Sequence, residues 1–152
     1  GVAGLASRFA QVRIMAVRFL ATDGGSMSDA IAALEYAVAN GASISSNSWG
    51  GSAGSSALQA AIDTAAEAGH LFITAAGNDG KSLDTGPEYP CVYAEAVCVA
   101  ATNAADQRAS YSNWGSQVEL AAPGSDILST VTQSSYAKLD GTSMATPHVA
   151  GA

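Results

Sequence analysis

Residues 43–75, with the sequence SISSNSWGGSAGSSALQAAIDTAAEAGHLFITA, contain the unit that decides the fold. Residues 43–49 alternate small and polar side chains up to a glycine pair, which predicts a strand. Ser55 or Ser56 can cap a helix, because a serine hydroxyl accepts a hydrogen bond from a free amide of the first turn. The apolar positions of that helix are Leu58, Ala61, Ile62, Ala65 and Ala66. Residues 71–75 are short and apolar, which is typical of a buried strand.

The preceding residues predict a second unit of the same kind. Residues 12–20, VRIMAVRFL, form a mostly apolar strand pattern. An amphipathic helix follows from Ser28, with Asp29 in its first turn, and Asn40-Gly41 should terminate it. Two successive β-α-β units imply right-handed crossovers and a parallel sheet with helices on both faces. Ligands of such sheets bind beyond the carboxyl ends of the strands.

Further strands are expected after a loop rich in Gly, Pro and Asp. They are predicted at residues 97–101, 118–121 and 127–131, and residues 136–139 are expected to pair beside the loop that leads to Gly141. No internal repeat, low-complexity tract or linker interrupts the pattern. The sequence therefore predicts one α/β domain.

The composition excludes several classes of function. Of the 152 residues, 48% are hydrophobic and 12% are charged, which suits a tightly packed α/β protein and argues against disorder. The net charge of −7, with only six Lys and Arg residues, makes nucleic acid an unfavourable partner. No apolar run approaches the roughly 20 residues of a membrane-spanning helix.

Two cysteines, Cys91 and Cys98, are too few for a disulfide framework or a zinc site. They are close in sequence, so one bridge closing a short loop is plausible in an oxidising compartment. Two buried free thiols are the alternative. We favour the bridge, provided that the intervening loop folds back far enough to meet the geometric limits of a disulfide.

The chemistry is concentrated in residues 141–151, GTSMATPHVAG. Ser143 stands where a polar loop gives way to an alanine-rich run, so its hydroxyl should lie at the start of a helix. The free amides and positive dipole end of a first turn stabilise negative charge that develops beside such a serine. Pro147 is expected to fall early enough in the helix that its missing N–H costs little. A simple helix cap is the alternative for an isolated Gly-Thr-Ser turn.

This string resembles the nucleophile segment of subtilisin-like serine proteases (subtilases), whose motif is G-T-S-M-A-x-P-H-V-A-G. Residues 75–80, AAGNDG, resemble the oxyanion-hole segment of the same family. The resemblance implies that Ser143 is the nucleophile and that Asn78 and the Ser143 N–H stabilise the oxyanion. It also implies a three-layer α/β/α fold with a mostly parallel sheet, incomplete at its N-terminal side.

The family resemblance extends to residues that would bind an extended peptide. Residues 48–51, SWGG, resemble the edge on which a substrate pairs as an added strand. The substrate-binding residues implied in this way are Ser48, Trp49, Gly50, Ala75, Gly77, Glu88 and Thr142. Trp49 would narrow a subsite for apolar or aromatic side chains, or else it fills the core.

Glu88 precedes Tyr89-Pro90, which matches a segment at the base of the specificity pocket, where the family's X–Pro bond is typically cis. An unpaired carboxylate on the pocket floor would attract Lys or Arg at P1, the substrate residue whose carbonyl is attacked. A solvated loop glutamate is the alternative for Glu88.

Neither histidine is expected to be the general base. His148 lies inside the nucleophile motif and belongs to the buried helix in the family, and a capping or surface role is predicted for His70. Subtilases carry Asp in a D-[ST]-G motif and His in an H-G-T-H motif, in the order Asp, His, Ser. The sequence contains neither motif.

Residues 1–20 instead resemble the segment just after the family's histidine helix, and the end of the chain cuts the serine helix. Residues 1–152 are therefore expected to be a partial catalytic domain, without the Asp and His segments and without the end of the serine helix. Such a chain alone should not hydrolyse peptides, since a serine without a base is a weak nucleophile.

The implied protein is a secreted, monomeric serine endopeptidase acting on peptides or proteins, with no cofactor required for its chemistry. A non-catalytic peptide-binding or regulatory relative is the alternative, and the upstream reading frame would separate the two. Residues 106–115 and 121–124 resemble family segments that support the active-site loops. Glu119 matches a carboxylate that binds structural calcium in some members, together with carbonyls around Pro90.

Overall fold

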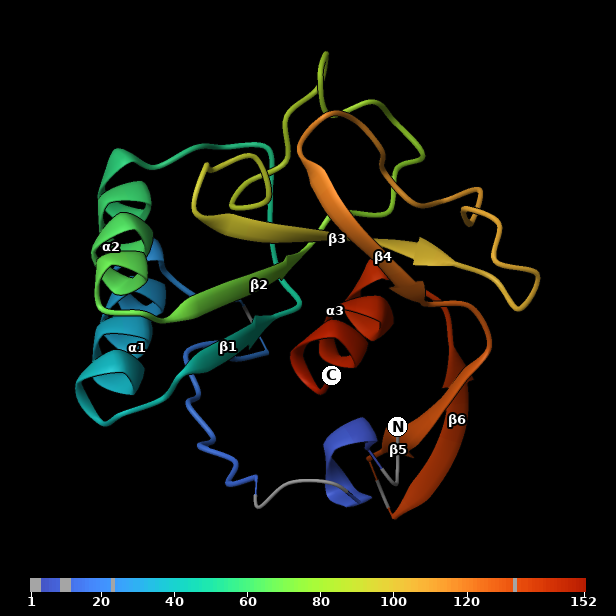
Figure 1. The fold of residues 1–152 in the computed structure, drawn as a ribbon, viewed down its shortest axis with the longest axis horizontal. Helices are drawn as coiled ribbons and strands as arrows, with labels where there is room; N and C mark the ends of the chain where they lie inside the picture. Colours follow the sequence, from blue (N-terminus) through green and yellow to red (C-terminus); the bar gives the residue numbers. More distant parts are fainter. Residues whose placement is uncertain (1–3, 9–11, 23, 133) are drawn as a thin grey trace.

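The protein is built around a four-stranded parallel sheet. A computed structural model describes residues 4–8, 12–22, 24–132 and 134–152. Residues 1–3 and 9–11, which belong to the stretch 1–20 that resembles a family segment, lie outside the described residues. The strands stand in the order β1-β2-β3-β4, and each pairs in parallel with the next (Figure 1). Their bounds are Ile44–Asn47 for β1, Leu71–Ala75 for β2, Ala96–Thr102 for β3 and Val118–Pro123 for β4.

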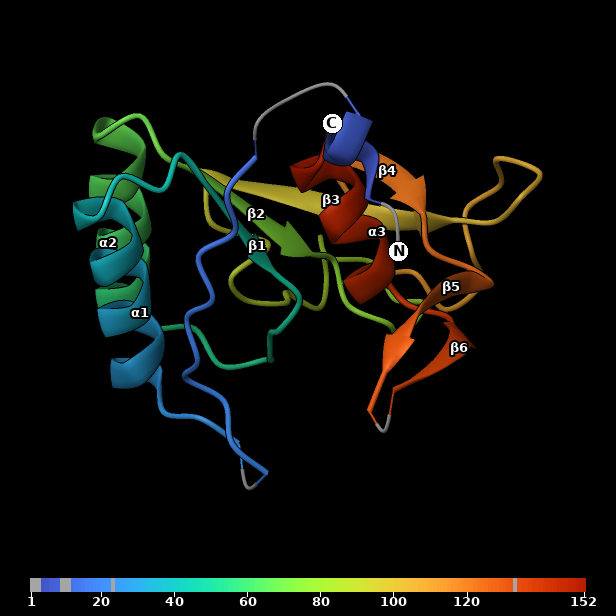
Figure 2. The same ribbon diagram turned by 90° about the horizontal axis from the view of Figure 1, so that it is seen from below.

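Helices cover both faces of the sheet, as predicted. Figure 2 shows α1 and α2 side by side on one side of the molecule and α3 away from them. The helices are α1 at Met27–Ala39, α2 at Ser56–Glu67 and α3 at Thr142–Ala150, with a short 3-10 helix at Leu5–Arg8. The α3 helix packs against all four strands of the sheet. The three layers confirm the α/β/α fold class.

Adjacent residues of β2 show how one strand serves two cores. Phe72 is buried in a cluster with side chains of α1 and α2, whereas its neighbour Ile73 is buried in a cluster that includes Ala145 of α3. Successive side chains of a strand point to opposite faces, so this alternation separates the two layers of helices. The central strand is hydrophobic on both faces because both faces are covered.

A serine side chain caps the N-terminus of each of the two long helices. Ser26 accepts a hydrogen bond from the Asp29 N–H at 3.1 Å, so α1 begins one residue before the expected Ser28. Of the two candidates for α2, Ser55 is the cap, and it accepts from the Leu58 N–H at 3.2 Å. Each bond satisfies an amide that has no partner within its own helix.

The last strands form a separate hairpin. Strand β5, at Ile127–Val131, pairs antiparallel with β6, at Ser135–Leu139, in a two-stranded sheet. The prediction of strands at 127–131 and 136–139 is confirmed. The second strand pairs with the first, and its end leads through Asp140 into α3.

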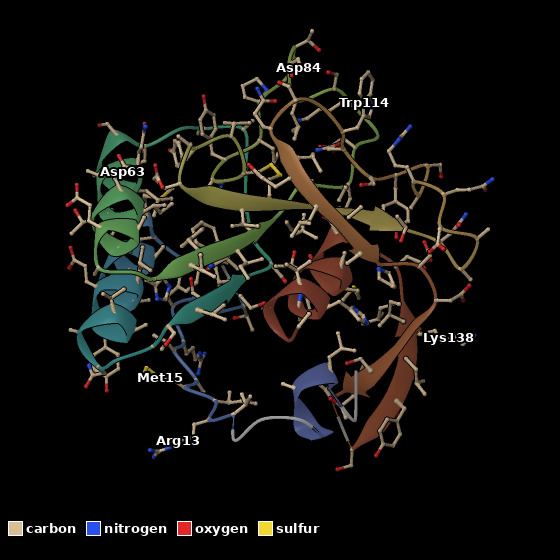
Figure 3. All side chains as sticks on the ribbon, in the orientation of Figure 1. Arg13, Met15, Asp63, Asp84, Trp114 and Lys138 are labelled. Carbon is tan, nitrogen blue, oxygen red and sulfur yellow. A yellow bond between two sulfur atoms is a disulfide. The ribbon has the colours of Figure 1, made fainter. Side chains whose placement is uncertain are left out.

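The expected strand at residues 12–20 is wrong for this structure. These residues form no ladder with β1, and several of their apolar side chains face solvent, with Ile14 92% exposed. Arg13 and Met15 also project outward at the periphery (Figure 3). A strand needs a hydrogen-bonded partner as well as an apolar pattern, and none of the described segments provides one here.

Candidate active site

A pocket of about 310 Å³ opens where the carboxyl ends of β1 and β2 meet the N-terminus of α3. This is the position that the parallel topology predicts for a ligand site. Every residue that the sequence suggested for catalysis or substrate binding lies on its wall, and Asp79 joins them. The lining residues are Ser48, Trp49, Gly50, Ala75, Gly77, Asn78, Asp79, Glu88, Thr142 and Ser143.

Ser143 is the second residue of α3, so its backbone N–H belongs to the first turn and has no helical acceptor. Gly141 precedes the helix, and both nitrogens of interest lie close to it. A Cβ placed on Gly141 would stand 3.5 Å from Met144 Sδ, 3.6 Å from the Ser143 nitrogen and 3.8 Å from Asn78 Nδ2. Two N–H donors from distant parts of the chain therefore lie within 4 Å of one point beside Gly141.

Thr142 fixes the orientation of the Asn78 side chain. The Thr142 N–H donates to Asn78 Oδ1 at 2.8 Å, and the Thr142 hydroxyl donates to the same oxygen at 3.0 Å. A backbone N–H can only donate, so this contact identifies the oxygen end of the amide and turns Nδ2 toward Ser143. Thr142 Oγ1 also accepts from the Gly77 N–H at 3.1 Å, and its residue is fully buried. Thr142 thus positions the loop through its hydrogen bonds with both Gly77 and Asn78.

Asn113 holds the same loop from the other side, and sequence reasoning did not single it out. Its Oδ1 accepts from the amides of Asp79 and Lys81 at 3.0 and 3.1 Å, and its Nδ2 donates to the Ala76 carbonyl at 2.9 Å. The residue is 0% exposed. Its only sequence signal was membership of residues 106–115, which were expected to support the active-site loops.

The Ser143 side chain has a weak partner within the chain. Its hydroxyl donates to the Ser48 carbonyl at 3.5 Å, while Ser48 Oγ donates to the Ser143 carbonyl at 2.9 Å. Pro147 explains the second bond, because a residue four positions after Ser143 would normally donate its N–H to that carbonyl. Pro147 is the sixth residue of α3, so it lies beyond the first turn, and Ser48 supplies the donor that the helix lacks there.

Both histidines make hydrogen bonds away from the Ser143 hydroxyl. His148 Nδ1 contacts the Met144 carbonyl at 2.7 Å within α3. His70 is only 4% exposed, so the predicted surface or capping role is wrong. Its Nδ1 contacts the Ala42 carbonyl at 2.7 Å and its Nε2 contacts Ser45 Oγ at 2.9 Å, which ties the loop after α1 to β1. Burial was not foreseen because Gly69 suggested an exposed turn.

Trp49 packs on the core, which was one of the two alternatives, and it also lines the pocket; that it narrows a subsite for apolar or aromatic side chains stays a prediction. Its ring makes edge contacts with Phe19 and Phe72, with centroid separations of 5.2 and 6.2 Å, and it packs on the buried cluster under α2. It is also part of the pocket wall. A ring anchored in the core gives that wall a fixed position.

The loop that carries Glu88 is fastened at several points. Tyr89 exchanges two backbone hydrogen bonds with Gly51, at 2.8 and 2.9 Å, and the Tyr89-Pro90 bond is cis. A disulfide joins Cys91 to Cys98 of β3, with a Cα–Cα distance of 4.9 Å that lies within the usual range. Glu88 is held beside the pocket by these restraints.

Glu88 is not unpaired, as the pocket-floor hypothesis required. Its Oε2 lies 3.2 Å from Lys81 Nζ, and its side chain is 14% exposed. It is therefore also not the solvated loop glutamate of the alternative. Lys81 was missed in the sequence because a lone lysine in a polar loop carries no distinctive signal.

Glu119 makes a structural hydrogen bond between neighbouring strands. Its Oε2 accepts from the Cys98 N–H at 2.6 Å, at the bulge between β3 and β4. Within the described ranges, no group of three or more His, Cys, Asp or Glu side chains is arranged to hold a metal ion. Calcium binding by Glu119 together with backbone carbonyls stays a prediction.

Ser143 lies at the N-terminus of a helix, and its backbone N–H and Asn78 Nδ2 lie near the same point beside Gly141. Hydrolases that attack carbonyl carbon use a serine and paired N–H donors of this kind. Residues 3–152 match the family model Peptidase_S8, described as the subtilase family, and the chain belongs to this family. Its relatives are therefore serine proteases of the subtilisin type.

Individual relatives support this membership. The chain is 46% identical over 152 residues to thermitase of Thermoactinomyces vulgaris and 42% identical over 154 residues to subtilisin of Bacillus pumilus. The alignments cover 99% and 100% of this chain and 52% and 55% of those proteins. The chain thus spans about half the length of the curated relatives it matches.

Solved structures share the fold. A cold adapted subtilisin-like serine proteinase superposes with a TM-score of 0.80 at 38% identity, covering 88% of this chain and 49% of that one. A lanthipeptide protease superposes with a TM-score of 0.83 at 25% identity, covering 89% of this chain and 52% of that one.

Proposed function

We propose that the chain is part of a secreted serine endopeptidase that cleaves peptides or proteins through an acyl-enzyme on Ser143. The observation that carries the proposal is the pair of donors, Ser143 N–H and Asn78 Nδ2, whose nitrogens both lie within 4 Å of one point beside Gly141. Donors placed in advance around a developing oxyanion are usually the largest single contribution to acyl-transfer catalysis.

In the proposed reaction, Ser143 Oγ attacks the scissile carbonyl and its proton passes to a histidine base. The base then returns the proton to the leaving amine, and water hydrolyses the acyl-enzyme in a second round. His70 and His148 are engaged elsewhere, so the base and its orienting Asp are proposed to come from sequence outside this chain. The oxyanion forms between the Ser143 amide and Asn78.

The substrate is proposed to lie extended along Ser48, Trp49 and Gly50. The backbone at Gly50 has no room for a side chain, because a Cβ there would stand 2.7 Å from the Tyr89 carbonyl oxygen. Glycine therefore lets the Tyr89 backbone lie close against this segment, and the peptide is proposed to pair with the main chain here. The pocket beside Ala75, Gly77 and Glu88 would receive the P1 side chain.

Secretion and a monomeric state remain part of the proposal. The Cys91–Cys98 disulfide supports an oxidising compartment. Among the helices in the described ranges, none has the length and apolar character needed to span a bilayer. The net charge of −7 supports protein substrates over nucleic acid.

The central test uses the longer protein that contains this chain. Ser143→Ala should abolish peptide hydrolysis, and a serine-directed phosphonate should label the unsubstituted protein at Ser143. Ser129→Ala, on the β5–β6 hairpin, is a control that should keep both activity and labelling. Activity that survives Ser143→Ala would remove the assigned nucleophile.

The non-catalytic alternative predicts a different result. A protein whose remaining sequence lacks D-[ST]-G or H-G-T-H would bind peptides without cleaving them and would not react with the phosphonate. The intact serine and asparagine segments favour the peptidase.

A further inference from the structure

Lys81, which does not line the pocket, forms ion pairs with two carboxylates that do, those of Glu88 and Asp79. Glu88 is the pocket carboxylate with the lowest exposure, and Lys81 Nζ lies 3.2 Å from its Oε2. The same ammonium lies 3.3 Å from Asp79 Oδ2, whose side chain is 61% exposed. One cation thus bridges two carboxylates that belong to the pocket lining.

Glu88 is placed where a substrate side chain would meet it. A Cβ on Gly77 would stand 3.2 Å from Glu88 Cγ, and a Cβ on Gly50 would stand 3.6 Å from Glu88 Oε1. The Glu88 side chain therefore lies against the backbone of both glycines, and all three residues line the pocket. Oε1 faces the Gly50 side while Oε2 is bound to Lys81.

Lys81 is held in position by its backbone. Its N–H donates to Asn113 Oδ1 at 3.1 Å, and Asn113 is fully buried. The Lys81 side chain is 35% exposed, so it stays on the surface while it reaches the pocket. The hydrogen bonds that the Lys81 ammonium donates, first to Glu88 and then to Asp79, raise the pKa of Lys81 above its ordinary value. The ammonium therefore remains charged throughout the neutral and mildly alkaline range.

We infer that Lys81 is a specificity-determining residue, which neutralises Glu88 and thereby directs the pocket toward apolar and uncharged P1 side chains. This inference rests on the proposed peptidase function. A P1 lysine or arginine would have to compete with Lys81 for the Glu88 carboxylate and would lie close to a like charge. Both effects reduce the attraction that a free carboxylate would exert.

The test compares the longer protein with its Lys81→Met variant on matched peptides that carry Lys, Arg, Leu or Phe at P1. The ratio of kcat/KM for basic over apolar P1 should rise about tenfold in the variant at low ionic strength, since one opposing charge near the site is removed. The rise should shrink as salt is added, because a charge open to solvent is screened. Hydrolysis of the apolar peptides reports that the variant is folded.

Three further variants identify the cause. Lys81→Arg should keep the original ratio, because it keeps the charge. Lys81→Met combined with Glu88→Gln should lose the rise, because the freed carboxylate is then gone. Lys138→Met removes another lysine that lies 3.8 Å from a carboxylate, on β6 at the edge of the molecule, and should leave the ratio unchanged (Figure 3).

An unchanged ratio in Lys81→Met, with apolar peptides still cleaved, would overturn the role of Lys81 and leave the peptidase proposal standing. An equal rise in Lys138→Met, or a rise that persists without the Glu88 carboxylate, would also overturn it. If the unsubstituted protein cleaves none of the peptides, the proposed function itself fails, and the inference fails with it.

Discussion

The hydrogen bond from the Thr142 amide to Asn78 Oδ1 decides what Asn78 can do. Asn78 Oδ1 accepts this bond at an N···O distance of 2.8 Å. Nδ2 is therefore the end of the amide that lies, with the Ser143 nitrogen, within 4 Å of one point beside Gly141. An amide that had to rotate before donating would lose part of its effect, because preorganised donors cost no rearrangement during the reaction. The position of one side chain thus depends on the residue just before the nucleophile.

Asn78→Ala should lower kcat much more than it changes KM. Removing one oxyanion donor from a subtilisin costs about 10²–10³ in kcat, and the same range is expected here. Steady-state kinetics of the longer protein provide the measurement. An effect confined to KM would place Asn78 in substrate binding and remove it from the oxyanion hole.

Thr142→Val should lower kcat by roughly 10- to 100-fold, because the Asn78 loop loses the two bonds of the Thr142 hydroxyl, to Asn78 Oδ1 and from the Gly77 N–H, while the side chain keeps its shape. Thr146→Val is the matched control. Thr146 is equally buried and also donates its hydroxyl to a backbone carbonyl, that of Thr142 at 2.8 Å, but it does not contact Asn78. It should keep kcat. Equal losses of kcat in the two variants would contradict the positioning role of Thr142.

At the scale of elements, α3 and the end of β1 are connected through a proline. The Pro147 ring removes one helical hydrogen bond, and the Ser143 carbonyl that is left over accepts from Ser48 Oγ at 2.9 Å. The helix that carries the nucleophile is thereby joined to the edge on which the substrate is proposed to lie. Neither Pro147 nor Ser48, taken alone, predicts this connection from the sequence.

The free energy of unfolding should reveal the coupling between Ser48 and Pro147. Ser48→Ala is expected to cost about 0.5–1.5 kcal/mol, and less when Pro147→Ala supplies an N–H for the Ser143 carbonyl. Thr64→Ala removes a comparable side-chain bond to a helix carbonyl in α2, at 2.8 Å, and should cost the same in both backgrounds. A Ser48→Ala cost that does not depend on residue 147 would contradict the coupling.

The loop between β2 and β3 is closed by the Cys91–Cys98 disulfide, and both cysteines are buried. Alkylation in denaturant should therefore leave both cysteines unmodified until a reductant is added. Mass spectrometry of the unreduced protein checks this. Two alkylated thiols without reduction would rule out the bridge.

At the scale of the whole molecule, a pocket is lined by residues at the ends of β1 and β2 and at the start of α3, while much apolar surface is exposed along residues 12–20. Val12 is 57% exposed and Ile14, two residues further along the same segment, is 92% exposed. The chain also spans about half the length of its relatives. Its two histidines are bonded away from Ser143.

The isolated 152-residue chain should therefore show no peptide hydrolysis under conditions in which the longer protein is active. The physical reason is that, among the residues that the structure describes, the Ser143 hydroxyl has only the Ser48 carbonyl as a partner, at 3.5 Å, and a carbonyl cannot remove a proton. A fluorogenic peptide assay on both proteins provides the comparison. Hydrolysis by the isolated chain would require a base that this structure does not identify.

Prediction from the sequence worked where the determining interactions are local. The helix at 56–67, its Ser55 cap and the strand at 71–75 follow from periodicity and from residues that terminate an element. It failed at residues 12–20 and at His70. In both cases, the outcome depends on which segment lies alongside, and an apolar pattern or a neighbouring glycine does not carry that information.

The sequence by itself determined the parallel α/β architecture, the family, and the set of residues that meet at the pocket. Periodicity and specific motifs carry that information because each is written in consecutive residues. Only the tertiary structure decided that Lys81 neutralises Glu88, that Ser48 replaces the donor missing at Pro147, and that Thr142 orients Asn78. These contacts join separate loops and elements, and side-chain hydrogen bonds depend on distances that the fold alone fixes.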